Sequence, residues 1–274
     1  MQSAKNNAAA EINWEALLAE AVTKPGRVLE AYHLFHNFSL GNALWALVQC
    51  EARQIQPGPL NTFSGWKKLN RHVKKGERAI WMVMPITCKR KEEDSDGEEE
   101  ESSYTRFVIR PNWFVLSQTE GEEVTAEIEI PEWNVERALA ELNISRVPYE
   151  SMNGNAQGYA EPGRKIAISP IAALPQKTMF HEMAHIVLEH TEQGGLSDDE
   201  QTPRSLMEAE AESVAMLCCE SLGLPGAEFS RAYIQNWLDG SPIPEKSAQK
   251  IFSAAHKILK AGQEKEDEKC NCAA

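Results

Sequence analysis

The sequence predicts a mixed α+β chain of two domains, one over residues 1–125 and one over residues 132–265, with a polar tail at 266–274. Its 274 residues suit two domains of ordinary size. Apolar runs bounded by turn residues predict strands, and apolar positions at helical spacing predict helices, so both kinds of element are expected. The polar stretch TEGEEVTAEIEIP at 119–131 is the expected linker between the domains.

The first half is expected to begin with helices and continue with strands. Apolar and charged residues alternate at helical spacing over 12–22, and Pro25 and Gly26 end that pattern. The elements that follow are a helix at about 40–54, a short helix and turn before Lys75-Gly76, a buried strand at 79–86, and strands at 107–109 and 113–116.

An acidic run separates those strands. Residues 92–101 read EEDSDGEEEE, and a block of like charges repels itself, so we expect a solvated loop over 91–103. Because strand-like segments lie on both sides, this loop is expected to join two paired strands as an enlarged hairpin.

The second half is expected to be mainly helical. Two strands should flank the turn-rich segment MNGNAQGYAEPG, one near 146–149 and one near 164–169. The expected helices lie at about 133–143, 175–190, 204–222, 227–238 and 243–261, with a polar loop at 194–203.

The charge of the chain is unevenly distributed. The formal net charge is −13, but residues 1–90 carry twelve Lys/Arg and six Asp/Glu, a net of +6, so the remainder carries −19. The first domain can therefore present a basic face to an acidic partner, and the second cannot.

Cysteine usage and hydropathy indicate the cytoplasm. The six cysteines are scattered, with Cys218 and Cys219 in an apolar helical stretch and Cys270 and Cys272 in the polar tail, which is no disulfide framework. We find no basic start followed by an apolar core and no apolar run of membrane-spanning length. A cytoplasmic protein without a membrane partner is expected.

A metal-binding pattern lies in the second half. His181-Glu182-Met183-Ala184-His185 fits H-E-x-x-H, and on a helix the two histidines share a face because they are four positions apart. Imidazole nitrogens are good Zn²⁺ ligands, and catalytic zinc keeps three protein ligands and a water. Glu182 is then the expected catalytic base, since it can accept a proton from that water. The alternative is a coincidental histidine pair on a surface helix.

The third ligand is expected on the helix at 204–222. Glu208 and Glu212 share a face, and we assign Glu208 as the ligand and Glu212 as the residue that orients a ligand histidine, with the reverse assignment left open. Glu210 is expected on the opposite, solvated face. His190, one turn after His185, is a further candidate or an ordinary surface histidine.

A basic run with interleaved aromatic residues lies in the first domain. Between Lys67 and Arg78 the chain has six basic residues and one Glu. Cations can follow phosphates, and aromatic faces can stack on bases, which is the combination that single-strand binding uses. The alternative is a buried tryptophan beside a solvated helix and turn. The candidate residues for binding single-stranded DNA are Phe63, Trp66, Lys67, Lys68, Arg71, Lys74, Lys75 and Arg78.

Several short motifs together resemble the ArdC-type antirestriction proteins. In the first half these are Phe38-Ser39-x-x-Asn42, FSGWK at 63–67, VKKGE at 73–77 and VLSQTEG at 115–121. In the second half they are Gly158-Tyr159, Lys177-Thr178 before the histidine motif, Glu208-x-x-x-Glu212, and LGL at 222–224. The acidic insertion at 92–101 departs from the family pattern.

The resemblance implies a fold and a function. It implies an N-terminal α+β domain that binds single-stranded DNA and a C-terminal zincin-like metallopeptidase domain of the gluzincin type, with Zn²⁺ as cofactor and an unidentified protein or peptide as substrate. Such a protein would protect mobile DNA from restriction. The alternatives are a regulatory zinc metallopeptidase that cleaves a protein such as a repressor, with the first domain recognising that protein, and a zincin fold that binds metal without turnover.

Overall fold

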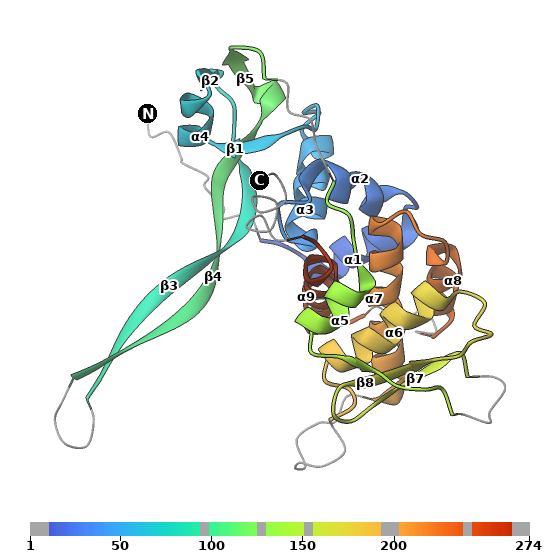
Figure 1. The fold of residues 1–274 in the computed structure, drawn as a ribbon. Coiled ribbons are helices and arrows are strands. Elements are labelled where there is room, and N and C mark those ends of the chain that lie inside the picture. The colour runs from blue at the N-terminus through green and yellow to red at the C-terminus, as the bar shows by residue number, and fades with distance from the viewer. Residues whose placement is uncertain are drawn as a thin grey trace, which may run out of the picture. The chain divides into compact units, whose positions relative to one another are not determined.

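The computed structural model describes residues 11–93, 99–124, 130–150, 156–192, 203–237 and 243–264 (Figure 1). The chain divides into two compact units, one built from the described parts of Met1–Ile12 and Trp45–Ala126, the other from Asn13–Leu44 and the described parts of Glu127–Ala274. Both contain helices and strands, so the predicted mixed α+β class is confirmed. Residues 13–44, which the sequence assigns to the N-terminal domain, belong by their contacts to the second unit.

The first unit is built around a three-stranded antiparallel sheet. Its order is β1 (Leu60–Thr62), β4 (Glu99–Val115) and β3 (Ile80–Glu93). The smaller elements of this unit are α4 (Phe63–Lys68), the 3-10 turn η1 (Leu116–Gln118), and the paired strands β2 (Arg71–Val73) and β5 (Thr119–Gly121). Helix α3 (Leu40–Ala52) belongs to both units, because the boundary between them falls at Leu44 and Trp45. The predicted linker at 119–131 therefore begins with a paired strand, and 125–129 lie outside the described residues.

The hairpin between β3 and β4 is longer than the sequence predicts. The expected pairing of the two strands is confirmed, but it runs from Ile80↔Trp113 to Glu93↔Glu99. Much of the predicted loop at 91–103 is thus strand, and residues 94–98 lie outside the described residues. The prediction of a loop was wrong at both ends, because strand pairing is made by backbone hydrogen bonds, which every one of these residue types can form.

The second unit is a helical assembly around α7 (Arg204–Ser221). Every residue of α7 from Ala209 to Ser221 is buried, and the helices in contact with it are α2 (Arg27–Phe35), α6 (Pro175–Val187), α8 (Ala227–Trp237) and α9 (Glu245–Ala261). Two further helices are α1 (Trp14–Thr23), which packs on α9 and α2, and α5 (Val135–Glu141), which packs on α9. The sequence gives no prediction for α2.

A small sheet packs on α6. Its order is β6 (Ser145–Arg146), β8 (Lys165–Ile168) and β7 (Gly158–Glu161), with β6 parallel and β7 antiparallel to β8. Figure 1 shows β7 and β8 beside α6. The sequence predicts turns over the whole segment before β8, but Gly158–Glu161 form a strand there. Residues 152–155 of that segment and most of the predicted loop at 194–203, like the tail at 266–274, lie outside the described residues.

Trp133 fixes the start of the C-terminal segment on α9. Its indole N–H donates to Ile258 O at 3.2 Å, its backbone bridges Gln263, and its ring meets Phe180 edge-on at 5.0 Å between centroids. Gly262 lies directly under the indole, where a Cβ would overlap the ring atoms. Since Phe180 immediately precedes His181, this contact also supports the part of α6 that carries the histidines.

Gly262→Ala is expected to destabilise the second unit by about 1–3 kcal/mol, because the added methyl group must displace a packed indole. Gly58→Ala is the control, since a Cβ there would lie 3.8 Å from Val115, an ordinary contact. Thermal unfolding followed by circular dichroism measures both. Equal melting temperatures for the two variants would contradict the proposed role of the Trp133 contact.

Candidate functional sites

Helices α6 and α7 bring together the residues that the histidine motif predicts. His181 and His185 lie four residues apart on one face of α6, and Glu208 and Glu212 lie four apart on α7. The two helices pack against each other, so the imidazoles of one face the carboxylates of the other.

Three atoms converge as metal ligands would. The Nε2 atoms of His181 and His185 are 3.1 Å apart, and Glu208 Oε2 lies 3.3 Å from the first and 3.6 Å from the second. Two ligands at about 2.0–2.1 Å from one tetrahedral ion lie about 3.4 Å apart. Among the described residues this is the one group of three or more His, Cys, Asp or Glu with such geometry.

The chemistry of these atoms also fits a cation. Glu212 Oε2 lies 3.0 Å from His181 Nδ1, and since a carboxylate only accepts, Nδ1 carries a proton. The neutral form of His181 therefore has its lone pair on Nε2. Burial lowers the pKa of His181, but the carboxylates of Glu208 and Glu212 outweigh it and raise that pKa to about 9. The neighbouring imidazoles of His181 and His185 hold the pKa of Glu208 far below its usual range. The cluster therefore attracts a proton, and a metal ion would take the place of that proton.

Glu212 is held by a second partner. Its Oε1 lies 2.5 Å from Lys177 Nζ, one turn before His181 on α6. Burial raises the pKa of Glu212, but the hydrogen bonds with His181 and Lys177 outweigh it and lower that pKa to about 2. Glu212 is thus a carboxylate fixed between two side chains of α6, as expected of a residue that orients His181. Lys177 had no assigned role in the sequence beyond its place in a motif.

Glu182 lies beside the cluster in a buried position. It is 6% exposed, and burial raises its pKa, against the opposing charges of His181 and His185. A Cβ on Gly158 of β7 would come within 3.0 Å of Glu182 Oε1, so only a glycine leaves this carboxylate its space. A desolvated carboxylate with a raised pKa is a stronger base than one in water.

Glu210 does not lie on a solvated face, and that prediction was wrong. It is 2% exposed, and its Oε2 lies 2.9 Å from His190 Nε2. His190 Nδ1 in turn lies 3.0 Å from His185 Nδ1. Helical period could not assign Glu210, because α7 is enclosed on all sides and has no solvated face over this stretch.

His190 reaches His185 because of how α6 ends. Glu189 adopts φ +62, and the N–H groups of His190 and Glu189 donate to His185 O at 2.9 Å and Ile186 O at 3.2 Å. This is the Schellman arrangement, which usually has glycine in the left-handed position. The sequence carries no glycine there, so the turn that returns His190 to the cluster was not signalled.

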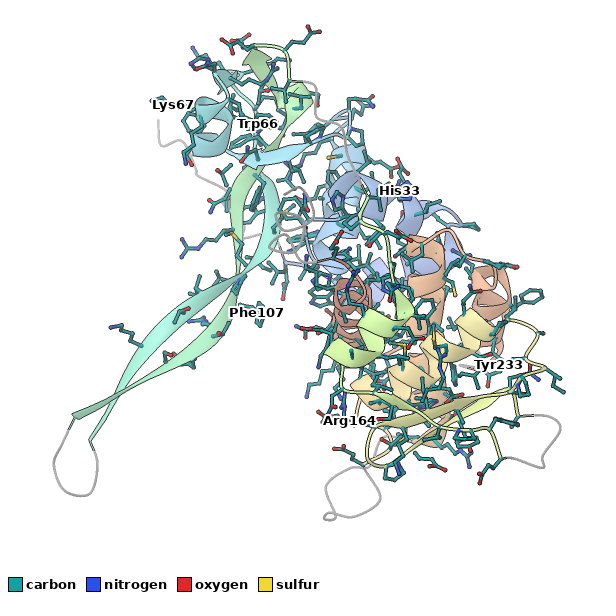
Figure 2. All side chains as sticks on the ribbon, in the orientation of Figure 1. His33, Trp66, Lys67, Phe107, Arg164 and Tyr233 are labelled. Atoms are coloured by element: carbon teal, nitrogen blue, oxygen red, sulfur yellow. The ribbon has the colours of Figure 1, made fainter. Side chains whose placement is uncertain are left out.

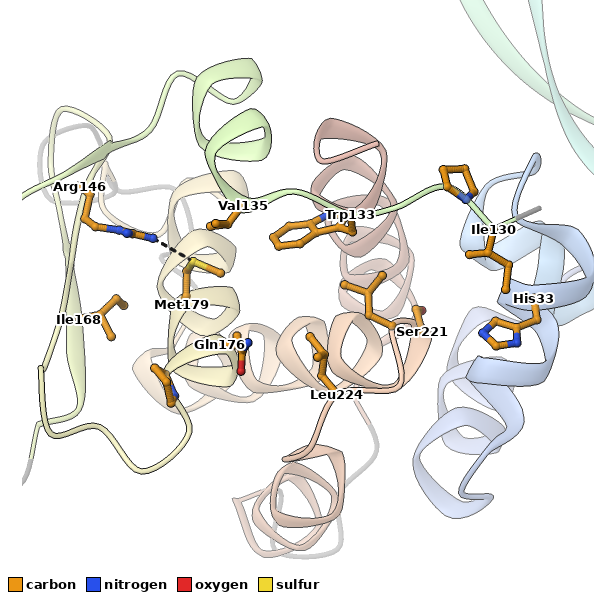
Figure 3. A pocket seen from close by; sticks show the side chains of 13 residues that line it. His33, Ile130, Trp133, Val135, Arg146, Ile168, Gln176, Met179, Ser221 and Leu224 are labelled. Atoms are coloured by element: carbon orange, nitrogen blue, oxygen red, sulfur yellow. Dashed lines mark hydrogen bonds between the residues drawn. The ribbon is translucent and has the colours of Figure 1, made fainter. Parts of the chain in front are cut away.

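A cavity of about 680 Å³ lies on a different face of α6 (Figure 3). The residues of α6 that line it are Pro175, Gln176 and Met179 rather than His181 and His185, and Arg146 donates to Met179 Sδ across it at 3.6 Å. Its size suits a small ligand. None of His181, Glu182, His185 or Glu208 lines it, so the cavity is not the metal cluster.

The candidate DNA-binding residues divide into exposed and structural groups. Trp66 is 2% exposed, and its indole N–H donates to Phe114 O at 2.8 Å, so its ring is core and the predicted stacking role was wrong. Arg71 is also engaged, donating to Thr119 Oγ1 at 2.8 Å and to the backbone of Glu122. Figure 2 shows Lys67 on the outer side of α4. The residues that remain exposed are Phe63, Lys67, Lys68, Lys74, Lys75 and Arg78.

The sequence alone did not separate these groups, because a tryptophan among lysines has the same pattern whether it stacks on bases or fills a core. Exposed aromatic residues that the sequence did not single out lie on β4, where Tyr104 and Phe107 are 52% and 65% exposed. Within the described part of the chain, no helix is long and apolar enough to span a membrane.

Residues 8–113 match a family model described as the N-terminal domain of anti-restriction factor ArdC. The N-terminal part of this chain is similar to that domain, so the predicted resemblance is confirmed for these residues. The matched region includes α1 and α2, so it is not coextensive with the first unit.

Solved structures of the antirestriction ArdC protein from the R388 plasmid are similar to this chain. The metal-free one is 21% identical with a TM-score of 0.48, covering 91% of this chain and 94% of that one. The Mn(II)-bound one is 19% identical with a TM-score of 0.47, covering 92% and 96%. No curated protein matches.

Glu208→Ala is expected to weaken metal binding more than Glu212→Ala, because Glu208 supplies a converging oxygen and Glu212 touches the far nitrogen of His181. Loss of an orienting partner costs about 10–100-fold in affinity, and loss of a ligand should exceed that. Competition with a chromogenic chelator measures both. A larger loss of metal affinity in Glu212→Ala would exchange the two roles. Glu210 is unsuitable as an inert control, because it contacts His190.

Proposed function

We propose that this protein is an ArdC-type antirestriction protein whose second unit is a zincin-like zinc metallopeptidase and whose N-terminal domain binds single-stranded DNA. The observation that carries the enzymatic part is the convergence of two imidazole nitrogens and one carboxylate oxygen beside the buried Glu182. The DNA-binding part is supported by the ArdC-type match and by the exposed cations around α4 and β2.

Zinc suits the ligand set. His181, His185 and Glu208 offer two nitrogens and one oxygen, which is the His₂Glu combination of catalytic zinc sites with a position left for water. The cluster is also accessible, since the side chains of His181 and Glu208 are 18% and 25% exposed. Mn²⁺ accepts the same donors with lower affinity and is the natural second metal to test.

The chain's own residues would carry out the proton transfers of peptide hydrolysis. A bound zinc ion would acidify a water molecule and polarise the peptide carbonyl. Glu182 would accept the proton of that water as the new C–O bond forms, and would pass it to the departing amine as the C–N bond breaks. Lys177 and Glu212 would keep the His181 ring in its binding orientation throughout.

The N-terminal domain presents cations and one aromatic ring to a nucleic acid. Phe63 is 60% exposed and lies one helical turn from Lys67 on α4. Its ring can stack on a base while Lys67, Lys68 and Lys75 follow phosphates. With Trp66 in the core, Phe63 takes over the stacking role in the proposal.

A second function is favoured by the same burial of Trp66. With Trp66 in the core, the exposed apolar residues Tyr104 and Phe107 on the hairpin are equally suited to a protein partner. The protein would then be a regulatory metallopeptidase whose N-terminal domain recognises its protein substrate.

The purified protein is expected to hold about one zinc per chain, and His185→Ala should remove it because a ligand is lost. Glu182→Gln should keep metal and fold but abolish cleavage of an unstructured protein such as casein, since only the base is lost. Metal content by plasma mass spectrometry and cleavage by gel assay read these out. Full zinc content in His185→Ala would refute the assignment, and zinc binding without turnover in the wild type would leave a metal-binding zincin fold.

The full-length protein is expected to bind an unstructured oligonucleotide with strong salt dependence. Replacing Lys67 and Lys75 by alanine should lower affinity and reduce the slope of log affinity against log salt by about 1.4, at about 0.7 for each phosphate contact. Phe63→Ala should lower affinity, at about 1–3 kcal/mol for a stacked base, without changing the slope.

Replacement of Lys165 and Lys246, exposed cations of the second unit, is the charge-matched control. Fluorescence anisotropy at several salt concentrations measures all four proteins. Absence of binding at low salt by a folded wild-type protein would reject the DNA proposal and favour the protein-recognition function.

A further inference from the structure

We propose that His190 and Glu210 are positioning residues that fix the tautomer of His185, so that its Nε2 presents a lone pair to the metal. This inference rests on the proposed metal site and assigns a role to two residues outside the ligand set. The three side chains form a continuous line from His185 Nδ1 through both nitrogens of His190 to Glu210 Oε2, with contacts of 3.0 and 2.9 Å.

The polarity of the line follows from its carboxylate end. Glu210 only accepts as a carboxylate, so His190 must carry its proton on Nε2. A neutral His190 then has a bare Nδ1, which accepts the N–H of His185 Nδ1. His185 is left with its lone pair on Nε2, the atom that lies 3.1 Å from His181 Nε2 in the ligand cluster.

The line is held rigidly enough to select one tautomer. The side chains of His190 and Glu210 are 4% and 3% exposed, so water does not compete for these contacts. Glu210 also accepts from Ser247 of α9, and Lys250 of the same helix stabilises its negative charge. The Schellman end of α6 fixes the backbone of His190 directly against His185.

Each of the two ligand histidines is thereby oriented by a carboxylate of α7. His181 is oriented by Glu212 directly, and His185 is oriented by Glu210 through an inserted imidazole. Both carboxylates come from α7, two residues apart, and neither reaches the ligand nitrogens themselves.

The test compares Glu210→Gln and His190→Phe with Glu220→Gln. In Glu210→Gln the new side-chain amide can donate to His190 Nε2, which allows the opposite tautomer. In His190→Phe the phenyl ring leaves His185 Nδ1 without an acceptor. Glu220 is the matched control, because it is a buried carboxylate of α7 that pairs with Arg231 and lies about 18 Å along the helix from Glu208. Any general loss of helix stability should appear in all three variants.

Two readouts separate positioning from packing. Chelator competition should show zinc affinity about 10-fold lower or more in Glu210→Gln and His190→Phe, with Glu220→Gln equal to the wild type. In the metal-free protein, ¹⁵N chemical shifts of the histidine rings should show His190 protonated on Nε2 alone in the wild type and a mixture of tautomers in Glu210→Gln. Thermal unfolding identifies variants that fail to fold.

The outcomes decide the proposal and the proposed function separately. We call the line from His185 through His190 to Glu210 the relay. Unchanged zinc affinity in both Glu210→Gln and His190→Phe, or a wild-type His190 protonated on Nδ1, would overturn it. A wild-type protein that takes up no zinc would reject the metallopeptidase proposal, but the ring ¹⁵N shifts would still decide the relay. Protonation of His190 on Nε2 in the wild type and loss of this tautomer in Glu210→Gln would support the relay. The same tautomers in the wild type and in Glu210→Gln would overturn it.

Discussion

The packing of α6 on α7 is the constraint on which the rest of the second unit depends. A pair of imidazoles on one helix meets carboxylates on the other, within a core that excludes most water. Desolvation makes these polar groups costly unless each has a partner, and the contacts of Lys177, Glu212, His190 and Glu210 supply partners for every nitrogen that faces away from the cluster. The remaining atoms, two lone pairs and a carboxylate oxygen, face one another. This arrangement favours a cation at their centre.

The sequence predicted the part of the site that obeys a simple period. His181 and His185 share a face of a helix whatever the tertiary fold, and so do Glu208 and Glu212, because each pair is four residues apart. Both pairs could therefore be predicted from the sequence. Glu210 was misassigned because α7 is buried around its whole circumference, so position on a helical wheel carried no information about exposure. His190 joins the site through a helix end formed at Glu189, a residue type that does not indicate a left-handed turn. The spacing from His185 raised His190 as a candidate, but nothing local in the sequence linked it to Glu210.

The fold was likewise predicted only in part. Most helices and the pairing of β3 with β4 followed from apolar spacing, and the family motifs in the N-terminal half matched an ArdC-type domain. Trp66 illustrates the limit, because its neighbours Lys67 and Lys68 are solvated while its own ring lies against β4. Alternation between core and surface within one turn of a short helix is set by tertiary contacts. Composition alone indicates a segment that is uniformly basic and aromatic.

The placement of α1 and α2 constrains how such chains can recombine. Trp14 packs on Phe252, the Val28 N–H donates to Glu220, and Gln263 donates to the Tyr32 hydroxyl at 2.7 Å, so the first helices cover the surface of the last ones. A genetic exchange that joined a foreign N-terminal segment at residue 127 would expose those apolar faces and leave the buried Glu220 short of one donor. The region that matches the ArdC model and the helical unit are therefore expected to be inherited together, although their sequences suggest two separable modules.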